Sequence, residues 1–338
     1  MTLLSVVHDE CSAALTDRLV TRGLVDVVTV GNTAAQKAWA GYPSAKTVRL
    51  VTEASVTSGE RKLADVGEVL VWGLLSVPRW LSRAAPTAAW YQVTATCQGG
   101  IVVADPLQWC VRHGQTDFRL TLRRPGTDLA APPVTVEVVV RLGGLDYLDG
   151  LDVVADDVVR ALTAARSTEP QAADLAAAPD GAEPAESLPL DRLALRVDWS
   201  EPADRVTRLI RSGIGRTTPA WTYLKRFPVS VGAAEVVEAP PCELAAGTIV
   251  RRDATGVVVQ TGDGMVRVSQ VRDAVGVLPT KSLRPGTRFG IDPEEELRSL
   301  WRRVADLERT VQWISEQVLP PPQETSPAQV AHLPPDLT

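Results

Sequence analysis

Short apolar runs recur through the first 165 residues, and stretches with helical spacing separate them. Strands are predicted at 3–7, 25–30, 48–51, 69–75, 91–96, 118–122 and 134–142. Helices are predicted at 13–22, with Gly23 as the candidate C-cap, and at 152–165. Apolar strands that alternate with helices predict a parallel sheet covered on both faces, so residues 1–165 are expected to form an α/β domain.

The pattern breaks at residues 166–190, which are rich in Ala, Pro and acidic residues and contain no aromatic residue. Such a composition buries little and predicts a linker. A second globular domain is expected at 191–290. Within it, Gly262-Asp263-Gly264 separates two β-branched runs, which predicts a hairpin turn. Trp199 and Trp221 are expected to be core anchors of this domain.

Residues 292–319 carry a heptad pattern. Asp292 and Pro293 are typical of a helix start. The apolar seam consists of Leu297, Leu300, Val304, Leu307, Val311, Ile314 and Val318. Mostly Val at the first core position and mostly Leu at the second favour a parallel two-stranded coil, in which Arg303 and Glu308 take flanking positions that pair across the interface. A homodimer or a partner protein is therefore expected at 297–318; the alternative is a helix packed on its own domain. The Pro-rich tail, 320–338, is expected to be mobile.

Composition narrows the class of protein. The chain of 338 residues is 45% hydrophobic and 22% charged, as in ordinary globular proteins. No long uninterrupted apolar run predicts a membrane helix, and the N-terminus does not read as a signal peptide. The 4 cysteines lack CxxC spacing, which argues against a zinc site or a disulfide framework and suggests the cytoplasm. The net charge of −6 argues against general polyanion binding, although residues 190–289 carry 15 Lys/Arg against 10 Asp/Glu.

Several motifs resemble one family in their order along the chain. Residues 195–224 contain an Asp-Trp-Ser opening, a Leu-Ile-Arg segment and a Pro-Ala-Trp turn, and they are similar to the entry of the C-terminal domain of methionyl-tRNA formyltransferases. Residues 245–271 resemble that domain's barrel strands, and 283–290 its closing Leu-x-x-Gly-x-x-Phe. Residues 104–122 resemble the family's Ala-x-Pro-Ile-Gln helix and the strand after it. The resemblance implies a Rossmann-like formyltransferase domain followed by a small OB-like β-barrel.

The resemblance also implies where catalysis would take place. The family uses Asn-x-His at a strand end and a later Asp, with 10-formyltetrahydrofolate as the formyl donor. Counting back from residues 104–106 places Gln92 at the Asn position and Thr94 at the His position. The Asp position falls near Ala130, two residues from Asp128. A Thr hydroxyl does not titrate near neutral pH, whereas the Gln92 amide can still donate a hydrogen bond to an oxyanion.

Other groups near the same strand offer alternative chemistry. Cys97 follows the strand, and Asp105, Cys110 and His113 belong to the next predicted helix. A Cys beside a His can form an activated thiolate, so Cys97 is a candidate catalytic residue. The alternative is a buried structural cysteine and a surface histidine. The N-terminal domain's loop that would close over folate is expected to be shortened between Gly31 and Val48.

Polar residues after the first strand and four tryptophans are ambiguous. His8, Asp9 and Glu10 lie where α/β folds bind ligands, but a helix cap explains the acids equally well. The tryptophans are expected to be core and lid residues; they are Trp72, Trp80, Trp90 and Trp109.

Three functional hypotheses remain open. The first is a diverged enzyme that transfers a one-carbon or acyl group to an amine, either aminoacyl-tRNA or a small molecule. The second is a non-catalytic member, a pseudoenzyme, that works in an assembly. The third is a true tRNA formyltransferase. The family's barrel helps to hold tRNA, and the phosphate-contact candidates here are Arg251, Arg252, Arg267, Arg284 and Arg288, with an ordinary basic surface as the alternative. No metal site is expected.

Overall fold

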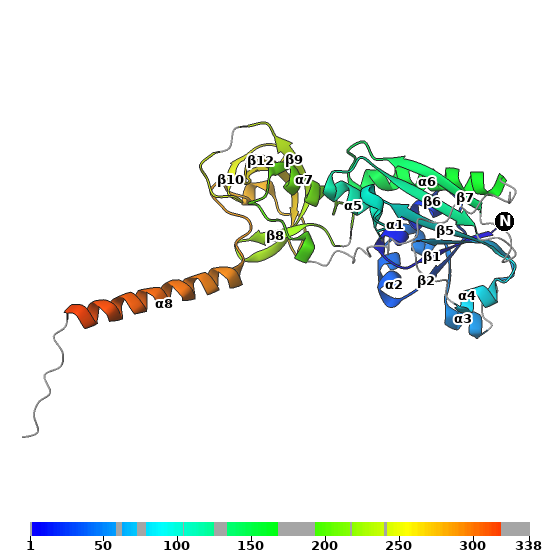
Figure 1. The fold of residues 1–338 in the computed structure, drawn as a ribbon, viewed down its shortest axis with the longest axis horizontal. Helices are drawn as coiled ribbons and strands as arrows, with labels where there is room; N and C mark the ends of the chain where they lie inside the picture. Colours follow the sequence, from blue (N-terminus) through cyan, green and yellow to red (C-terminus); the bar gives the residue numbers. More distant parts are fainter. Residues whose placement is uncertain are drawn as a thin grey trace, which may run out of the picture. The chain divides into compact units, whose positions relative to one another are not determined.

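A computed structural model describes residues 2–58, 63–72, 79–103, 105–124, 134–167, 193–216, 218–239 and 242–318. The chain divides into two compact units, residues 1–290 and 291–338 (Figure 1). The first unit contains two sheets, and the second contains one long helix. Asp128, Ala130, the predicted linker from 168 onward and the tail at 320–338 lie outside the described residues.

The first sheet has seven strands. They are β1 (Thr2–Val7), β2 (Val27–Val30), β3 (Arg49–Val51), β4 (Val66–Trp72), β5 (Ala89–Thr96), β6 (Asp117–Arg124) and β7 (Val134–Arg141). The helices of this domain are α1 (Glu10–Thr21), α2 (Thr33–Ala40), α3 (Glu53–Thr57), α4 (Arg79–Ala84), α5 (Pro106–His113) and α6 (Tyr147–Ser167). Short 3-10 helices lie at Pro43–Lys46 (η1) and Gln98–Gly100 (η2). The sequence therefore predicted each strand of this sheet to within a few residues.

The strand order is β3-β2-β1-β4-β5-β6-β7, and the strands up to β5 are parallel. The predicted parallel sheet is confirmed for β1 to β5, whereas β6 pairs antiparallel with both β5 and β7. The reason is visible in β6, where buried Phe118, Leu120 and Leu122 alternate with more exposed polar residues. Such alternation is typical of an antiparallel strand with one polar face.

Two apolar cores lie on opposite faces of this sheet. Helices α1, α2, α5 and α6 contribute to one core, which includes the fully buried Trp39, Tyr91 and Tyr147. Helices α3 and α4 pack on the other face, over β1 and β4. Burial of such large side chains is the main stabilising contribution to a domain of this kind.

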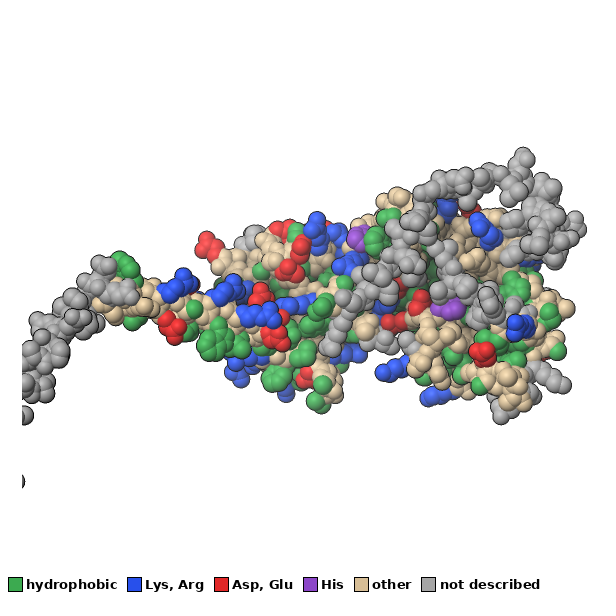
Figure 2. Space-filling model, turned by 60° about the horizontal axis from the view of Figure 1, so that its bottom comes forward, with side chains coloured by type: hydrophobic (Ala, Val, Ile, Leu, Met, Phe, Trp, Pro, Cys, Tyr) green, Lys and Arg blue, Asp and Glu red, His purple; other side chains and the backbone are tan. Residues whose placement is uncertain are grey.

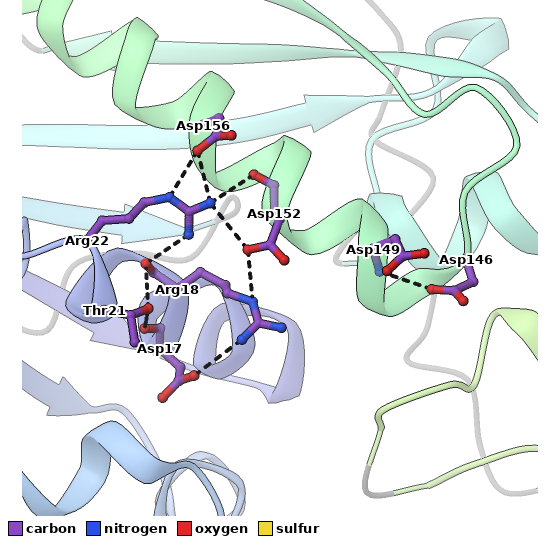
Figure 3. Close-up of polar contacts among 8 residues, drawn as sticks. All are labelled: Asp17, Arg18, Thr21, Arg22, Asp146, Asp149, Asp152 and Asp156. Atoms are coloured by element: carbon purple, nitrogen blue, oxygen red, sulfur yellow. Dashed lines mark hydrogen bonds and ion pairs between the residues drawn. The ribbon is translucent and has the colours of Figure 1, made fainter.

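Helices α1 and α6 are also joined by a network of ion pairs (Figure 3). Arg18 and Arg22 of α1 both contact Asp152 of α6 at 3.2 Å, and Arg22 reaches Asp156 at 2.9 Å. The two aspartates are more than half exposed, so each pair is worth little by itself, and the network mainly fixes how the helices align.

The second sheet has five strands in the order β10-β11-β12-β9-β8. They are β8 (Trp221–Leu224), β9 (Phe227–Val237), β10 (Ile249–Arg252), β11 (Val257–Gln260) and β12 (Met265–Arg272). Short 3-10 helices lie at Leu193–Leu195 (η3) and Thr280–Ser282 (η4). Arg288 bridges to Thr248 beside β10, and Phe289 bridges to Leu224 of β8. Residues 288–289 thus connect the two edges and close the sheet on itself, which leaves few unpaired edge groups.

The second sheet agrees with two predictions from the sequence, the hairpin and the buried tryptophans. Val257–Gln260 and Met265–Arg272 pair as the predicted hairpin around Gly262-Asp263-Gly264. Trp199 and Trp221 are buried, and the Trp199 ring stacks on Phe289 with centroids 5.4 Å apart. Helix α7 (Ala203–Arg211) packs Val206 and Ile210 into this core.

The second unit contains α8 (Pro293–Val318), which agrees with the predicted heptad helix. Over the described part of the chain, no helix combines the length and apolar character that crossing a bilayer requires.

Candidate functional site

Strand β5 carries the two positions at which the family resemblance implies catalysis. Gln92 and Thr94 alternate with Tyr91, Val93 and Ala95, whose side chains are buried in the core shared with α1 and α6. Since successive side chains of a strand point to opposite faces, Gln92 and Thr94 lie together on the other, partly exposed face.

The sheet register defines the neighbours of these two side chains. Gln92 lies opposite Arg123 of β6, and Thr94 lies opposite Thr121. One strand further, Thr121 lies opposite Glu137. Glu137 is ion-paired with Arg119 at 3.1 Å. Among the described residues of β5, β6 and β7, no imidazole occupies this face, so it lacks a group that exchanges a proton near neutral pH.

Cys97 directly follows β5 and lies beside Cys110 of α5. Their sulfurs are 3.6 Å apart, and both residues are buried. The neighbouring Cys97 thiol and burial together raise the pKa of the Cys110 thiol. A nucleophilic thiolate requires the opposite shift. His113, at the end of the same helix, lies against Trp109 with ring centroids 4.2 Å apart.

The region between Gly31 and Val48 is partly helical, and the expectation that it is shorter than the family's loop stays a prediction. It contains α2 and η1, and Trp39 of α2 is buried in the core. Gly31 is needed for close packing, because a Cβ there would lie 2.5 Å from Nδ1 of His8. Helix α2 of this segment therefore packs its Trp39 side chain into the core of the α/β domain.

Polar residues gather at the carboxyl edge of the parallel strands. Asp9 follows β1 and caps α1, accepting a 2.7 Å hydrogen bond from the Ser12 amide. Glu10 is the first residue of α1, and Asp105 caps α5 after β5. Parallel strands end at one edge, so both helix starts lie where α/β folds bind ligands.

Arg216, from the second domain, occupies the space between these helix starts. Its guanidinium forms an ion pair with Asp105 and another with Glu10 at 3.3 Å. It also lies over the Tyr147 ring, 5.0 Å from the centroid, and the Tyr147 hydroxyl donates to Asp105 at 3.3 Å. The side chains of Arg216, Glu10 and Asp105 are each 11–15% exposed, so this carboxyl-edge cluster of four residues is largely buried.

Burial and charge set the protonation of the cluster. Burial raises the pKa of the Tyr147 hydroxyl, which therefore stays protonated and acts as a donor. Burial alone would lower the pKa of Arg216, but Asp105, Tyr147 and Glu10 outweigh it and raise that pKa. Burial also raises the pKa of the neighbouring Cys11 thiol. One guanidinium thus stands against two carboxylates, an arrangement that holds the two domains together.

The sequence did not reveal this cluster as a unit. The sequence pointed to Asp105 and Glu10 but not to Tyr147 or Arg216. Arg216 and Asp105 are more than 100 residues apart in the chain, so their contact could not be foreseen. The local signal was weak: Arg216 follows two glycines in a segment of the second domain. Gly215 adopts φ +78° and packs on Leu148, which brings Arg216 to the first domain.

No cluster of three or more His, Cys, Asp or Glu among the described residues is arranged to hold a metal ion. The standard use of a formyl donor needs a titratable group beside the Gln92 amide, and the described face of β5 offers Thr94 instead. The described face of β5 thus presents an amide at Gln92 and a hydroxyl at Thr94.

The basic residues of the second sheet differ in how they are engaged. Arg267 forms ion pairs with Asp253 at 2.8 Å and with Glu235. Arg252 donates to the Lys281 carbonyl, and Arg288 donates to the Ala246 carbonyl. Arg251 and Arg284 are exposed. Three of the five candidate arginines thus contact groups of the same chain, and the other two are exposed.

The fold and the site together define a class of protein. Its members have a Rossmann-like α/β domain followed by a small closed antiparallel sheet, with polar groups at the carboxyl edge of the parallel strands. Residues 191–277 match the family described as formyl transferase, C-terminal domain. The chain is 27% identical over 199 residues to a methionyl-tRNA formyltransferase of Thiobacillus denitrificans, covering 55% of this chain and 62% of that protein. It is 28% identical over 238 residues to one of Paraburkholderia phymatum, covering 69% and 71%.

A solved structure supports the same fold. HypX from Aquifex aeolicus, crystallised in complex with tetrahydrofolic acid, superposes with a TM-score of 0.51 at 15% identity. The match covers 81% of this chain and 44% of the HypX chain. The chain thus spans less than two thirds of the Thiobacillus denitrificans protein and less than half of HypX. The chain is formyltransferase-like.

Proposed function

We propose that this formyltransferase-like protein does not perform the standard transfer from 10-formyltetrahydrofolate and acts in the cytoplasm as a non-catalytic member of an oligomeric assembly. The observation that carries the proposal is Thr94. The family resemblance implies a catalytic His at this position, and the register neighbour of Thr94 on the same face is Thr121. Residue chemistry decides activity more strongly than fold does.

The carboxyl-edge cluster supports the same proposal. Arg216 bridges Glu10 and Asp105 at the edge where α/β proteins receive ligands. Both carboxylates of the cluster are ion-paired with the same guanidinium, which comes from the same chain. The Cys110 thiol supplies no substitute nucleophile, because its surroundings raise its pKa and favour the protonated form, and the neighbouring Cys97 is buried beside it.

One observation favours a second function. Gln92 keeps an amide at the Asn position, and an amide can stabilise an oxyanion. In this alternative the chain transfers a one-carbon group from 10-formyltetrahydrofolate to the amine of an aminoacyl-tRNA or of a small molecule. Arg123, opposite Gln92, would add positive charge to the same face.

A formyl-transfer assay separates the two functions. The full chain is incubated with 10-formyltetrahydrofolate and either methionyl-tRNA or a panel of amines, and formylated product is measured. The proposal predicts no product above the rate without protein. Transfer that falls at least tenfold in Gln92→Ala, but not in the exposed Arg119→Ala control, would establish the second function instead.

A further inference from the structure

Helix α8 presents an uncovered apolar stripe. It is 26 residues long and belongs to the unit at 291–338, whereas both sheets belong to the unit at 1–290. Six core-position side chains of its heptad repeat are between 43% and 63% exposed; they are Leu297, Leu300, Val304, Leu307, Val311 and Ile314. Figure 2 shows apolar side chains between charged ones along this helix, at the left of the view.

A stripe of this kind is costly to leave in water. Each large aliphatic side chain gains about 1.5–3 kcal/mol when it is fully buried. An isolated helix gains little from local propensity, and most helical stability in proteins comes from packing of an apolar face. The stripe therefore needs a partner surface with the same repeat.

A second copy of this chain fits that requirement. Knobs-into-holes packing needs the 3.5-residue repeat on both helices, and an identical helix supplies it. Val304 and Val311 lie at the first core position, while Leu300 and Leu307 lie at the second. β-branched residues at the first position with Leu at the second favour two strands.

Charge selects the orientation of the two helices. In a parallel pair, Arg303 of one copy lies beside Glu308 of the other, and symmetry forms this pair twice. In a centred antiparallel pair, Arg303 would instead lie beside Thr310. The intrachain ion pairs of α8, Arg298–Glu294 and Arg309–Asp306, lie away from the stripe.

Arg303 and Glu308 are available for this contact. Within the described part of α8, neither of them forms an intrachain ion pair. We propose that α8 pairs with α8 of a second copy in a parallel, in-register, two-stranded coiled coil. The inference gives the assembly named under the proposed function its partner and its geometry, and it does not depend on whether the α/β domain is active.

The test is the mass of the full chain in solution, measured by sedimentation equilibrium without any folate. The wild type is expected to have about twice the mass of one 36.3 kDa chain. Leu307→Asp is expected to reduce the mass to that of one chain. Trp313 is the matched control, because it is also 63% exposed but lies off the stripe. Trp313→Asp is expected to remain dimeric.

Mixed charge variants test the orientation. Arg303→Glu and Glu308→Arg each place like charges across the parallel interface and are expected to weaken their own dimers about tenfold. Mixed together they restore both ion pairs and form a heterodimer preferentially. A dimer with a Kd of about 1 μM is mostly associated at roughly 50 μM chain. A monomeric wild type at that concentration, or equal loss of the dimer in Trp313→Asp, would overturn the proposal. Absence of a heterodimer preference would overturn the parallel orientation.

Discussion

Arg216 forms a buried ionic contact between the two domains. Its guanidinium is shared by Glu10 and Asp105 and lies on the Tyr147 ring, with 11% of its side chain exposed. Removing one partner of a buried ion pair leaves the remaining charge uncompensated, which costs far more than the pair contributes in net terms. Two carboxylates would be left in this position.

Arg216→Ala is therefore expected to lower the free energy of unfolding by about 3–5 kcal/mol. Arg119→Ala is the matched control, because Arg119 and Glu137 are both more than half exposed. Its expected cost is below about 1 kcal/mol. Urea unfolding of both variants provides the measurement.

A double variant checks the cause of that loss. Adding Asp105→Asn to Arg216→Ala removes one of the stranded charges, so part of the lost stability should return. If the double variant is less stable than Arg216→Ala, or if the two single arginine variants lose the same amount, the buried-charge explanation is wrong.

Among the elements, the β11–β12 hairpin links its turn to the start of the second domain. A Cβ at Gly262 would lie 2.0 Å from the Ser200 carbonyl oxygen, which is backbone and cannot move aside easily. Gly264 is different, because its Cβ would meet the Ala203 Cβ at 3.4 Å, an ordinary contact. Two glycines in one turn thus have different structural roles.

Gly262→Ala is expected to destabilise the protein by about 1–3 kcal/mol, the usual cost of forcing extra volume into a packed site. Gly264→Ala is expected to cost less than about 1 kcal/mol, since Gly to Ala also restricts the unfolded chain. Thermal unfolding of the two variants under one condition compares them. Equal transition temperatures would contradict the close approach at Gly262.

The sequence predicted where helices and strands lie better than it predicted the direction in which the strands pair. The hairpin was visible because Gly and Asp interrupt two Val-rich runs, and α8 was visible because its repeat is unbroken. The direction of β6 and β7 was missed, although the alternation of Phe118, Leu120 and Leu122 indicated it. Strand direction depends on long connections, whereas periodicity is local.

Across the whole molecule, the family resemblance agrees with an α/β sheet followed by a second, antiparallel sheet, whereas the predicted site residues stay a prediction. Gln92 and Thr94 were found by counting from a motif, and the structure places both on one face of β5. The cluster around Arg216 was not predictable, because Asp105 and Arg216 meet across 111 residues of chain. Contacts between domains leave no periodic signal in a sequence.

At the scale of the whole molecule, we propose that the formyltransferase-like scaffold persists without the standard use of folate. The basis of this proposal is the Thr at position 94 and the buried cluster at the carboxyl edge. The fold alone is compatible with either outcome, since one fold supports many functions. Ligand binding therefore separates them more directly than any further structural comparison.

The measurement is calorimetric titration of the full chain with 5-formyltetrahydrofolate, a stable analogue of the donor, beside a thermal shift at the same ligand concentrations. The account predicts no saturable heat and no change in the unfolding temperature at millimolar ligand. Saturable binding with a micromolar Kd, accompanied by a raised unfolding temperature, would show that the donor pocket persists and would contradict the account.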